Sequence, residues 1–259
     1  MTTGPAPATS RDAFLGGRLV IEQPRDGGHR AGLDAIMLAA AVEARPGERL
    51  VDLGAGVGTA GLAAAARLPG IEAMLVEIDP MLAALAGANA AGNGLGDRVR
   101  VIVADIAAPA GAREAAGLTA NLGDVVIVNP PFHEPGQVRH SPNAARERAH
   151  VLEAGLERWL RTATHVLKPG GRLVLIHRAE ALADVLAVTA GRFGGLDVVP
   201  LYPRAGAAAS RIIVTARKGS RAPLRLFGGL MLHEDGSSRY TAAADAVLCG
   251  AALRVAAPR

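Results

Sequence analysis

The tetrapeptide Asn129-Pro130-Pro131-Phe132 combines residue types that suit a planar group bearing an –NH₂. Two successive prolines fix the backbone and remove two N–H donors. The side-chain oxygen of Asn129 and the carbonyl of Pro130 therefore remain as acceptors, and Phe132 adds an aromatic face on which a flat base or amide can stack. We predict that this segment holds and orients an amino group. The alternative is a proline turn that simply ends a strand.

A glycine-rich segment at residues 52–58 (DLGAGVG) predicts a second ligand site. Glycine lets the backbone turn sharply and approach a ligand closely. The helix expected to begin at Thr59 presents unpaired N–H groups there. Asp52, directly before the glycines, would repel a pyrophosphate but suits a cationic amine or sulfonium. A tight turn between strand and helix, without a ligand, is the alternative.

Acidic residues follow the next two predicted strands. Glu77 ends a strand about 20 residues past the glycines, the position at which a ribose diol is held in dinucleotide sites. Asp105 follows the third strand and suits an adenine amino group, or is a solvated acid. Asp79 directly precedes Pro80 at a helix start, so it is interpreted as the helix N-cap.

A basic segment broken by proline and glycine follows the tetrapeptide and is expected at the mouth of the site. Its candidates for phosphate contacts with a nucleic acid are Arg139, His140, Arg146 and Arg148. A solvated lid is the alternative. The adjacent His133 and Glu134 are a poor set of metal ligands, and no metal is expected.

The elements that position these residues alternate between short apolar runs and alanine-rich helical runs. The predicted strands at 49–53, 73–78, 99–104, 124–128 and 171–177 are apolar almost throughout, as parallel strands covered on both faces are. Predicted helices cover 59–67, 80–91, 144–167 and 180–192. This alternation predicts an α/β fold with an open, doubly wound sheet. The short loop between 196–202 and 210–217 predicts an antiparallel pair, and hence a mostly parallel seven-stranded sheet.

Length and composition favour one globular domain. The 259 residues are 50% apolar and 20% charged. We expect a flexible polar tail at 1–17 and a single domain at 18–259. Within it, 18–43 forms an N-terminal strand and helix appendage, and 223–256 forms a C-terminal appendage. Asp34 is expected either to cap the helix of the first appendage or to line the ligand pocket, and Trp159 is expected in the core.

Several classes of protein are excluded or disfavoured by composition. Cys249 is the single cysteine, which excludes a disulfide framework, and it is expected to be a small buried hydrophobe. No apolar run reaches the ~18 residues of a membrane span. The N-terminus lacks the order of a secretion signal, so a cytoplasmic location is expected. The net charge of +4 permits nucleic-acid binding without arguing strongly for it.

In this order on successive strands, the glycine segment, the two acids and the Asn-Pro-Pro-Phe tetrapeptide resemble the class I S-adenosylmethionine (SAM)-dependent methyltransferases. The tetrapeptide matches the signature of the amino-methylating branch, which methylates adenine N6, cytosine N4 or a glutamine amide. The resemblance covers about residues 18–217 and implies a Rossmann-like sheet that ends in an antiparallel hairpin. The candidate cofactor-binding residues are Asp52, Gly54, Ala55, Gly56, Gly58, Glu77, Ile78, Asp105, Ile106 and Asn129. The candidate catalytic residues are Asn129, Pro130, Pro131 and Phe132.

A narrower resemblance links residues 28–39, 210–213 and 233–241 to the bacterial valine-tRNA adenine-N6-methyltransferase group. His29 and Phe132 stand where that group has tyrosine. The resemblance implies a SAM-dependent N-methyltransferase acting on an adenine of tRNA. Three alternatives stay open. The first is a methyltransferase for a protein glutamine or a small molecule, the second an O-methyltransferase, and the third a SAM- or nucleic-acid-binding module without catalysis. The oligomeric state is not predicted.

Overall fold

The structure is a computed structural model that describes residues 8–25, 32–131 and 144–253, with the backbone alone for 144–154. Its helices are α1 (Leu33–Ala40), α2 (Thr59–Arg67), α3 (Pro80–Gly92), α4 (Ala110–Ala115), α5 (Ala144–Val166), α6 (Leu182–Thr189) and α7 (Ala242–Leu248), with a 3₁₀ turn at Ala179–Ala181. Its strands are β1 (Thr9–Phe14), β2 (Leu19–Pro24), β3 (Arg49–Leu53), β4 (Glu72–Glu77), β5 (Val99–Val103), β6 (Gly123–Val128), β7 (Leu167–Arg178), β8 (Phe193–Tyr202), β9 (Arg211–Lys218), β10 (Arg225–Leu226) and β11 (Leu230–Met231).

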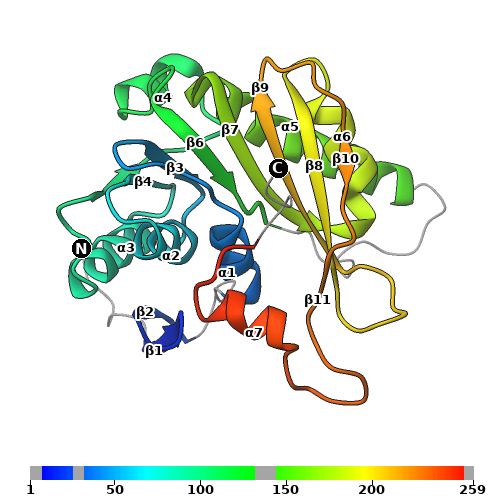
Figure 1. Cartoon of the computed structure of the whole chain (residues 1–259). Coiled ribbons are helices and arrows are strands. Elements are labelled where there is room, and N and C mark those ends of the chain that lie inside the picture. Colours follow the sequence, from blue (N-terminus) through cyan, green and yellow to red (C-terminus); the bar gives the residue numbers. More distant parts are fainter. Residues whose placement is uncertain (1–7, 26–31, 132–143, 254–259) are drawn as a thin grey trace.

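Parallel strands form the centre of the sheet in the order β5-β4-β3-β6-β7 (Figure 1). The chain builds one side of β3 first, with β4 and β5, and then crosses to the other side to form β6. Such a switch leaves a crevice at the carboxyl ends of the strands, where ligands bind in open α/β sheets. The predicted doubly wound sheet is confirmed.

The strands beyond β7 confirm the predicted antiparallel hairpin. Strand β9 lies between β7 and β8 and is antiparallel to both. The two-residue strands β10 and β11 add to the edge at β8, which makes a nine-stranded sheet rather than the expected seven. The five parallel strands and the hairpin are those that the sequence predicts.

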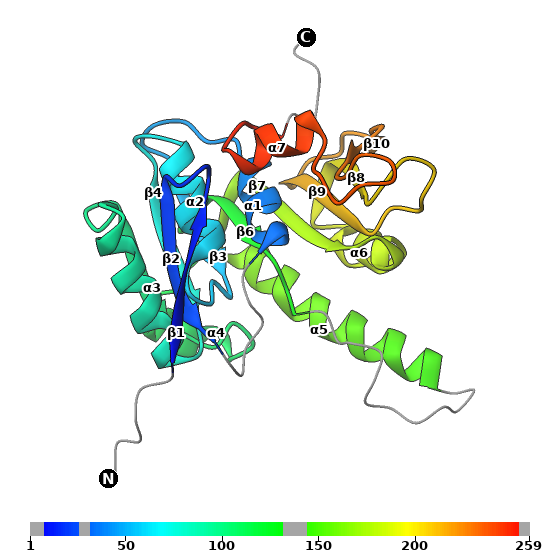
Figure 2. The ribbon, with the colours of Figure 1, turned by 90° about the horizontal axis from the view of Figure 1, so that it is seen from below.

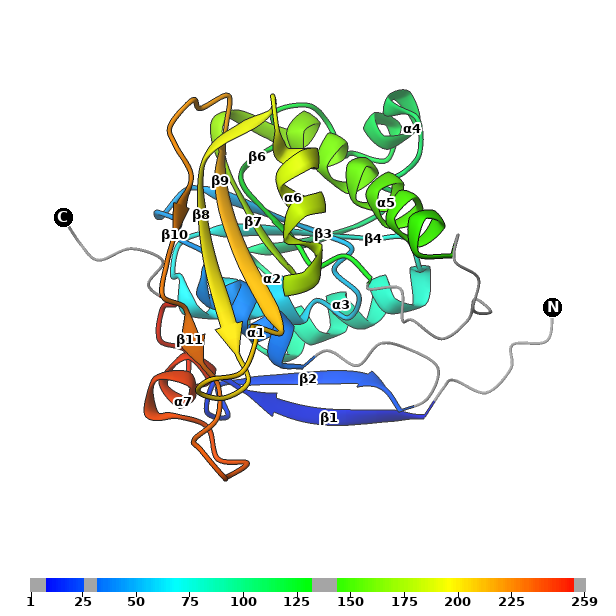
Figure 3. The ribbon, with the colours of Figure 1, turned by 90° about the vertical axis from the view of Figure 1, so that its right-hand side faces the viewer.

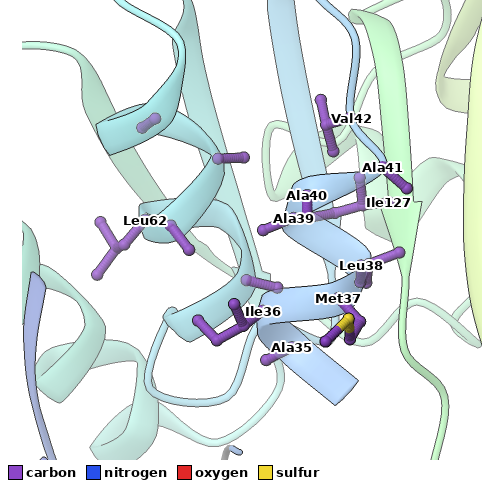
Figure 4. Packing of buried hydrophobic residues seen from close by; sticks show 14 of the residues in the cluster. Ala35, Ile36, Met37, Leu38, Ala39, Ala40, Ala41, Val42, Leu62 and Ile127 are labelled. Carbon is purple, nitrogen blue, oxygen red and sulfur yellow. The ribbon is translucent and has the colours of Figure 1, made fainter. Parts of the chain in front are cut away.

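The apolar strands are buried on both faces because helices cover both. In β6, Val125 and Ile127 belong to the core cluster under α1 and α2, whereas Val126 and Val128 belong to the cluster under α5 and α6. Figure 3 shows these two helical layers on opposite sides of the sheet. Figure 4 shows α1 packed between α2 and the strand that carries Ile127. The small alanine side chains of α1 permit this close approach.

The N-terminal segment differs from the prediction. A flexible tail over 1–17 is wrong for Thr9–Phe14, which form β1 and pair antiparallel with β2. The segment is polar and has no clear apolar alternation, so its strand depends on backbone pairing with β2 and on the hydrogen bond from Thr9 Oγ1 to Glu22 (2.6 Å). Figure 2, from below, shows this hairpin lying alongside α3.

The C-terminal appendage returns to the N-terminal one. Helix α7 packs on α1, and the Leu253 N–H donates to the Ala40 carbonyl at 2.9 Å. Cys249 at the end of α7 is exposed, so the prediction of a buried cysteine is wrong. Helix α7 buries Ala244 and Val247 instead, and Cys249 follows its last turn. No helix in the described part of the chain is long and apolar enough to span a membrane.

Candidate active site

Loops that follow four strands of the parallel core meet at one edge of the sheet. Leu53 at the end of β3 pairs with Val128 of β6 on one side and with Val76 of β4 on the other. Glu77 in turn pairs with Val103 of β5. The segments predicted to carry chemistry directly adjoin these paired residues, so the register of the sheet brings them together.

A cavity of about 570 Å³ opens at this edge, a volume within the ~300–1,000 Å³ range of small-molecule sites. Most of the predicted site residues line it, namely Asp52, Gly54, Ala55, Gly56, Glu77, Ile78, Asp105, Ile106, Asn129, Pro130 and Pro131. Gly58 does not line the cavity. It is the N-cap of α2, with a positive φ of 89°. Residues far apart in the sequence therefore form one concave site.

Two features of the backbone at Gly54 explain why this position is a glycine. Its φ is 69°, and a Cβ there would lie 2.3 Å from Cη2 of Trp159. Only glycine meets both conditions without strain. Trp159 packs against the apolar cluster on this side of the sheet, as predicted, but it is only half-buried and its side chain also lines the cavity. The core interpretation of Trp159 was therefore incomplete.

Asp52 is a buried carboxyl beneath the glycine loop. Its Oδ2 accepts a hydrogen bond from the Gly61 N–H at 2.8 Å. Burial raises the pKa of Asp52 from 3.8 to about 7, the hydrogen bond from Gly61 opposes this, and the charge of Glu77 adds to it. A cation bound beside Asp52 would favour the ionised form.

Thr59 offers an unsatisfied polar group at the start of α2. Its Oγ1 is buried and has no hydrogen-bond partner among the described residues. The residue lines the cavity, so a polar ligand atom could supply the missing partner.

Glu77 holds three backbone N–H groups at the end of β4. Its Oε2 accepts from Gly56 at 2.8 Å, and its Oε1 accepts from Ile78 and Asp79, both at 2.9 Å. A carboxylate has about four acceptor positions, so one remains for a ligand hydroxyl in this arrangement. Two hydrogen bonds from the predicted ribose diol would require one of these contacts to change. Asp79 accepts from the N–H groups of Met81 and Leu82, which confirms it as the N-cap of α3.

Two of the remaining predicted residues have described side chains, and the others do not. Asp105 is exposed, and its Oδ1 accepts from the Ala107 N–H at 2.7 Å. Asn129 is half-buried, and its side chain has no hydrogen bond to a described residue. Phe132, Arg139 and His140 lie outside the described residues. Arg146 and Arg148 belong to α5, but their side chains are not described.

The structure adds residues to the site that the sequence analysis missed. Helix α5 contributes Gly155, Arg158 and Trp159, which share one face, and β2 contributes Gln23 and Pro24. Arg158 is exposed and forms no hydrogen bond or ion pair with a described residue. The sequence indicates this face of α5 only through the three- and four-residue spacing of these residues, which places them on the same side of a helix.

Asp34 lines the cavity, which was one of its two predicted roles. The other role is wrong, because the N-cap of α1 is Gly32 and no side chain caps that helix. Asp34 instead accepts from Arg211 Nε at 2.9 Å across 177 residues of sequence. Among the described residues, no group of three or more His, Cys, Asp or Glu side chains is arranged to hold a metal.

Comparison with known families and sequences agrees with this geometry. Residues 31–199 match the model of the methyltransferase small domain family. A Porphyromonas gingivalis protein named tRNA1(Val) (adenine(37)-N6)-methyltransferase is 32% identical over 165 residues, which cover 60% of this chain and 61% of that one. The chain thus spans about 61% of the length of the first curated relatives that it matches. A Dickeya chrysanthemi protein of the same name is 27% identical over 84% of this chain and 85% of its own.

Solved structures have the same architecture. A protein from Agrobacterium tumefaciens described as a predicted O-methyltransferase superposes with a TM-score of 0.72 and 36% identity, over 85% of this chain and 97% of its own. TrmN from Thermus thermophilus superposes with a TM-score of 0.51 and 26% identity, over 71% of this chain and 48% of its own.

Proposed function

Because the chain belongs to the methyltransferase small domain family, we propose that it is a SAM-dependent N-methyltransferase acting on the exocyclic amine of an adenine in tRNA. The proposal rests on one observation. Asp52, the glycine loop and Glu77 line the same cavity as Asn129-Pro130-Pro131. One part of that cavity suits a cationic nucleoside, and the other suits a planar amine.

The residues present fit SAM, the proposed cofactor. The buried Asp52 carboxyl has a raised pKa, and a bound cation such as a sulfonium or ammonium would stabilise its charged form. The orphaned Thr59 hydroxyl and the remaining acceptor position of Glu77 suit polar groups of the cofactor. When bound, SAM supplies an electrophilic methyl group.

The chain's own contribution to the reaction is to aim the amine. The side-chain oxygen of Asn129 and the carbonyl of Pro130 accept the two amine hydrogens. Both bonds turn the nitrogen lone pair toward the methyl group and stabilise the positive charge that develops on nitrogen. Phe132 stacks on the target base. The product ammonium is acidic enough to lose its proton to water, so this reaction needs no general base.

An RNA substrate is supported by the names of the curated relatives and by cations near the site. Arg158 lines the cavity without a partner among the described residues, and α5 carries Arg146 and Arg148 closer to its N-terminus. Arginine suits planar, bidentate phosphate contacts. A target adenine must be unstacked to reach the cavity, which a tRNA loop allows. The proposal places the enzyme in the cytoplasm, with its substrate.

Each alternative function predicts a different property of the protein. A protein glutamine or a small molecule would be bound with little dependence on salt, because phosphates would not contribute. An O-methyltransferase acts on a hydroxyl, which has one hydrogen and would leave one of the two proposed acceptors unpaired. A binding module without catalysis would retain SAM affinity and show no turnover.

The deciding experiment is methyl transfer from labelled SAM to tRNA that lacks modifications, followed by mass spectrometry of the nucleosides. We expect N6-methyladenosine. Methylation of a ribose hydroxyl, methylation of protein alone, or no methylation at all would contradict the proposal. SAM binding measured by calorimetry on the same preparation separates an inactive binding module from a misfolded enzyme.

A further inference from the structure

Among the described residues, side chains rather than another strand pair with the outer edge of β2. Backbone groups of alternate residues in a strand point to opposite edges, so Val20 and Glu22 face away from β1. Asn93 accepts from the Val20 N–H at 2.8 Å and donates to its carbonyl at 2.7 Å. Asn89 accepts from the Glu22 N–H at 2.8 Å and donates to its carbonyl at 2.9 Å. Each amide thus reproduces the pairing of a neighbouring strand.

The spacing of the two asparagines explains why one helix can pair with a strand. Four residues along a helix advance by ~6 Å, and two residues along a strand advance by ~6.7 Å. Asn89 and Asn93 of α3 therefore match Glu22 and Val20 of β2, with helix and strand running in opposite directions.

Asn89 also makes a contact that Asn93 lacks. Its Nδ2 donates a second hydrogen bond, at 3.0 Å, to the carbonyl of Val57 in the glycine loop. The second hydrogen bond of Asn93 Nδ2 stays within α3, where it reaches the Asn89 carbonyl at 2.7 Å. The Asn89 side chain is buried, with 5% of the residue exposed. Val57 lines the cavity, and so do Gln23 and Pro24, which directly follow Glu22. One amide therefore joins helix α3, the glycine loop and the N-terminal hairpin, two of which form walls of the cavity.

We propose that Asn89 is a positioning residue for the cofactor, which sets the glycine loop and the β1–β2 hairpin relative to each other. The inference rests on the proposed SAM site. It makes the N-terminal hairpin a part of that site, although its residues lie outside the glycine, acid and tetrapeptide motifs. Asn93 anchors the same hairpin but is not joined to the loop, so it provides a matched control.

The test compares Asn89→Ala and Asn93→Ala with the parent chain by calorimetric titration of SAM and by thermal unfolding without ligand. Both variants lose hydrogen bonds to β2, so both are expected to unfold at lower temperature. We expect Asn89→Ala to weaken SAM binding by tenfold or more, and Asn93→Ala to change it by less than twofold. A merely structural role for Asn89 would lower the unfolding temperature and leave SAM affinity at the parental value.

Equal SAM affinities for Asn89→Ala and the parent, or equal losses in the two variants, would overturn the inference. A parent chain that does not bind SAM would instead overturn the proposed function. If Asn89→Ala does not fold, hydrogen exchange on the parent decides. Because coupling between two parts of a site is reciprocal, SAM should slow exchange of the Glu22 N–H, and an unchanged rate would contradict the coupling.

Discussion

At the residue scale, the Asp52 carboxyl carries both a stability effect and a binding effect. In the folded protein it holds its proton up to about pH 7, whereas in the unfolded chain it ionises near its usual value of 3.8. Between these values the folded state binds more protons than the unfolded state. The contribution of Asp52 to stability is therefore complete below about pH 4 and is lost as the pH rises to about 7.

Asp52→Asn tests this pH dependence. An asparagine oxygen can still accept from the Gly61 N–H but does not ionise, so the variant should be more stable than the parent at pH 8, by on the order of a few kcal/mol. Urea unfolding at pH 5 and pH 8 measures the difference. A parent and variant that respond equally to pH would contradict the raised pKa of Asp52.

The same substitution, which should raise stability at pH 8, should weaken cofactor binding. In the proposed SAM site, ionised Asp52 would attract the cationic cofactor, so the affinity of the parent should increase between pH 6 and pH 8. Asp52→Asn should bind SAM more weakly than the parent at pH 8 and lack this increase. Calorimetric titration at the two pH values measures both. Stronger SAM binding by the variant at pH 8 would exclude Asp52 from the cation site.

Asn129 is the residue on which the proposed amine chemistry depends. Asn129→Ala removes one of the two proposed acceptors, which should slow single-turnover methyl transfer about a hundredfold, or ~3 kcal/mol in the transition state. The assay uses unmodified tRNA, with SAM affinity measured in parallel. If Asn129→Ala transfers methyl groups at the parental rate, the tetrapeptide is only a turn at the end of β6.

At the scale of the elements, α5 and the glycine loop are packed at a distance that only glycine allows. Gly54→Ala would place a methyl group 2.3 Å from Cη2 of Trp159 and force an alanine to a φ of 69°. We expect a loss of roughly 2–4 kcal/mol in the free energy of unfolding. Combining it with Trp159→Leu relieves the contact but not the backbone strain.

Urea unfolding of the two single variants and the double variant measures this coupling as a double-mutant cycle. We expect the double variant to be more stable than the sum of the single effects by about 1–2 kcal/mol. Additive effects would show that Trp159 does not limit the approach of α5 to the glycine loop.

At the scale of the whole molecule, the proposed RNA surface lies at the carboxyl edge of the sheet. Arg146→Ala combined with Arg148→Ala should weaken tRNA binding and reduce the slope of log affinity against log salt by about two, one for each phosphate contact. SAM affinity should not change. The matched control is Arg100→Ala with Arg217→Ala, since these exposed arginines lie at the opposite edge of the sheet. A slope that changes only in the control would move the RNA to the other edge.

The sequence by itself determined the five parallel strands, most of the helices and the order of the motifs. The strand Arg49–Leu53 and the helix Thr59–Arg67 have the predicted bounds. The N-cap role of Asp79 and the antiparallel hairpin also followed from the sequence. These properties depend on apolar periodicity, capping and loop length, which are patterns within a few neighbouring residues. The site motifs were found for the same reason, because each adjoins the end of a recognisable strand.

Only the tertiary structure decided which distant side chains share the site. The ion pair of Asp34 with Arg211 spans 177 residues, and Asn89 reaches both Glu22 and Val57. The strand at Thr9–Phe14 and the exposure of Cys249 were predicted wrongly because each depends on a neighbour supplied by another part of the chain. Trp159 has the helical spacing of a core residue, and its second role follows only from the packing of α5 against Gly54. Such contacts follow from how elements pack in three dimensions, and local patterns in the sequence do not encode them.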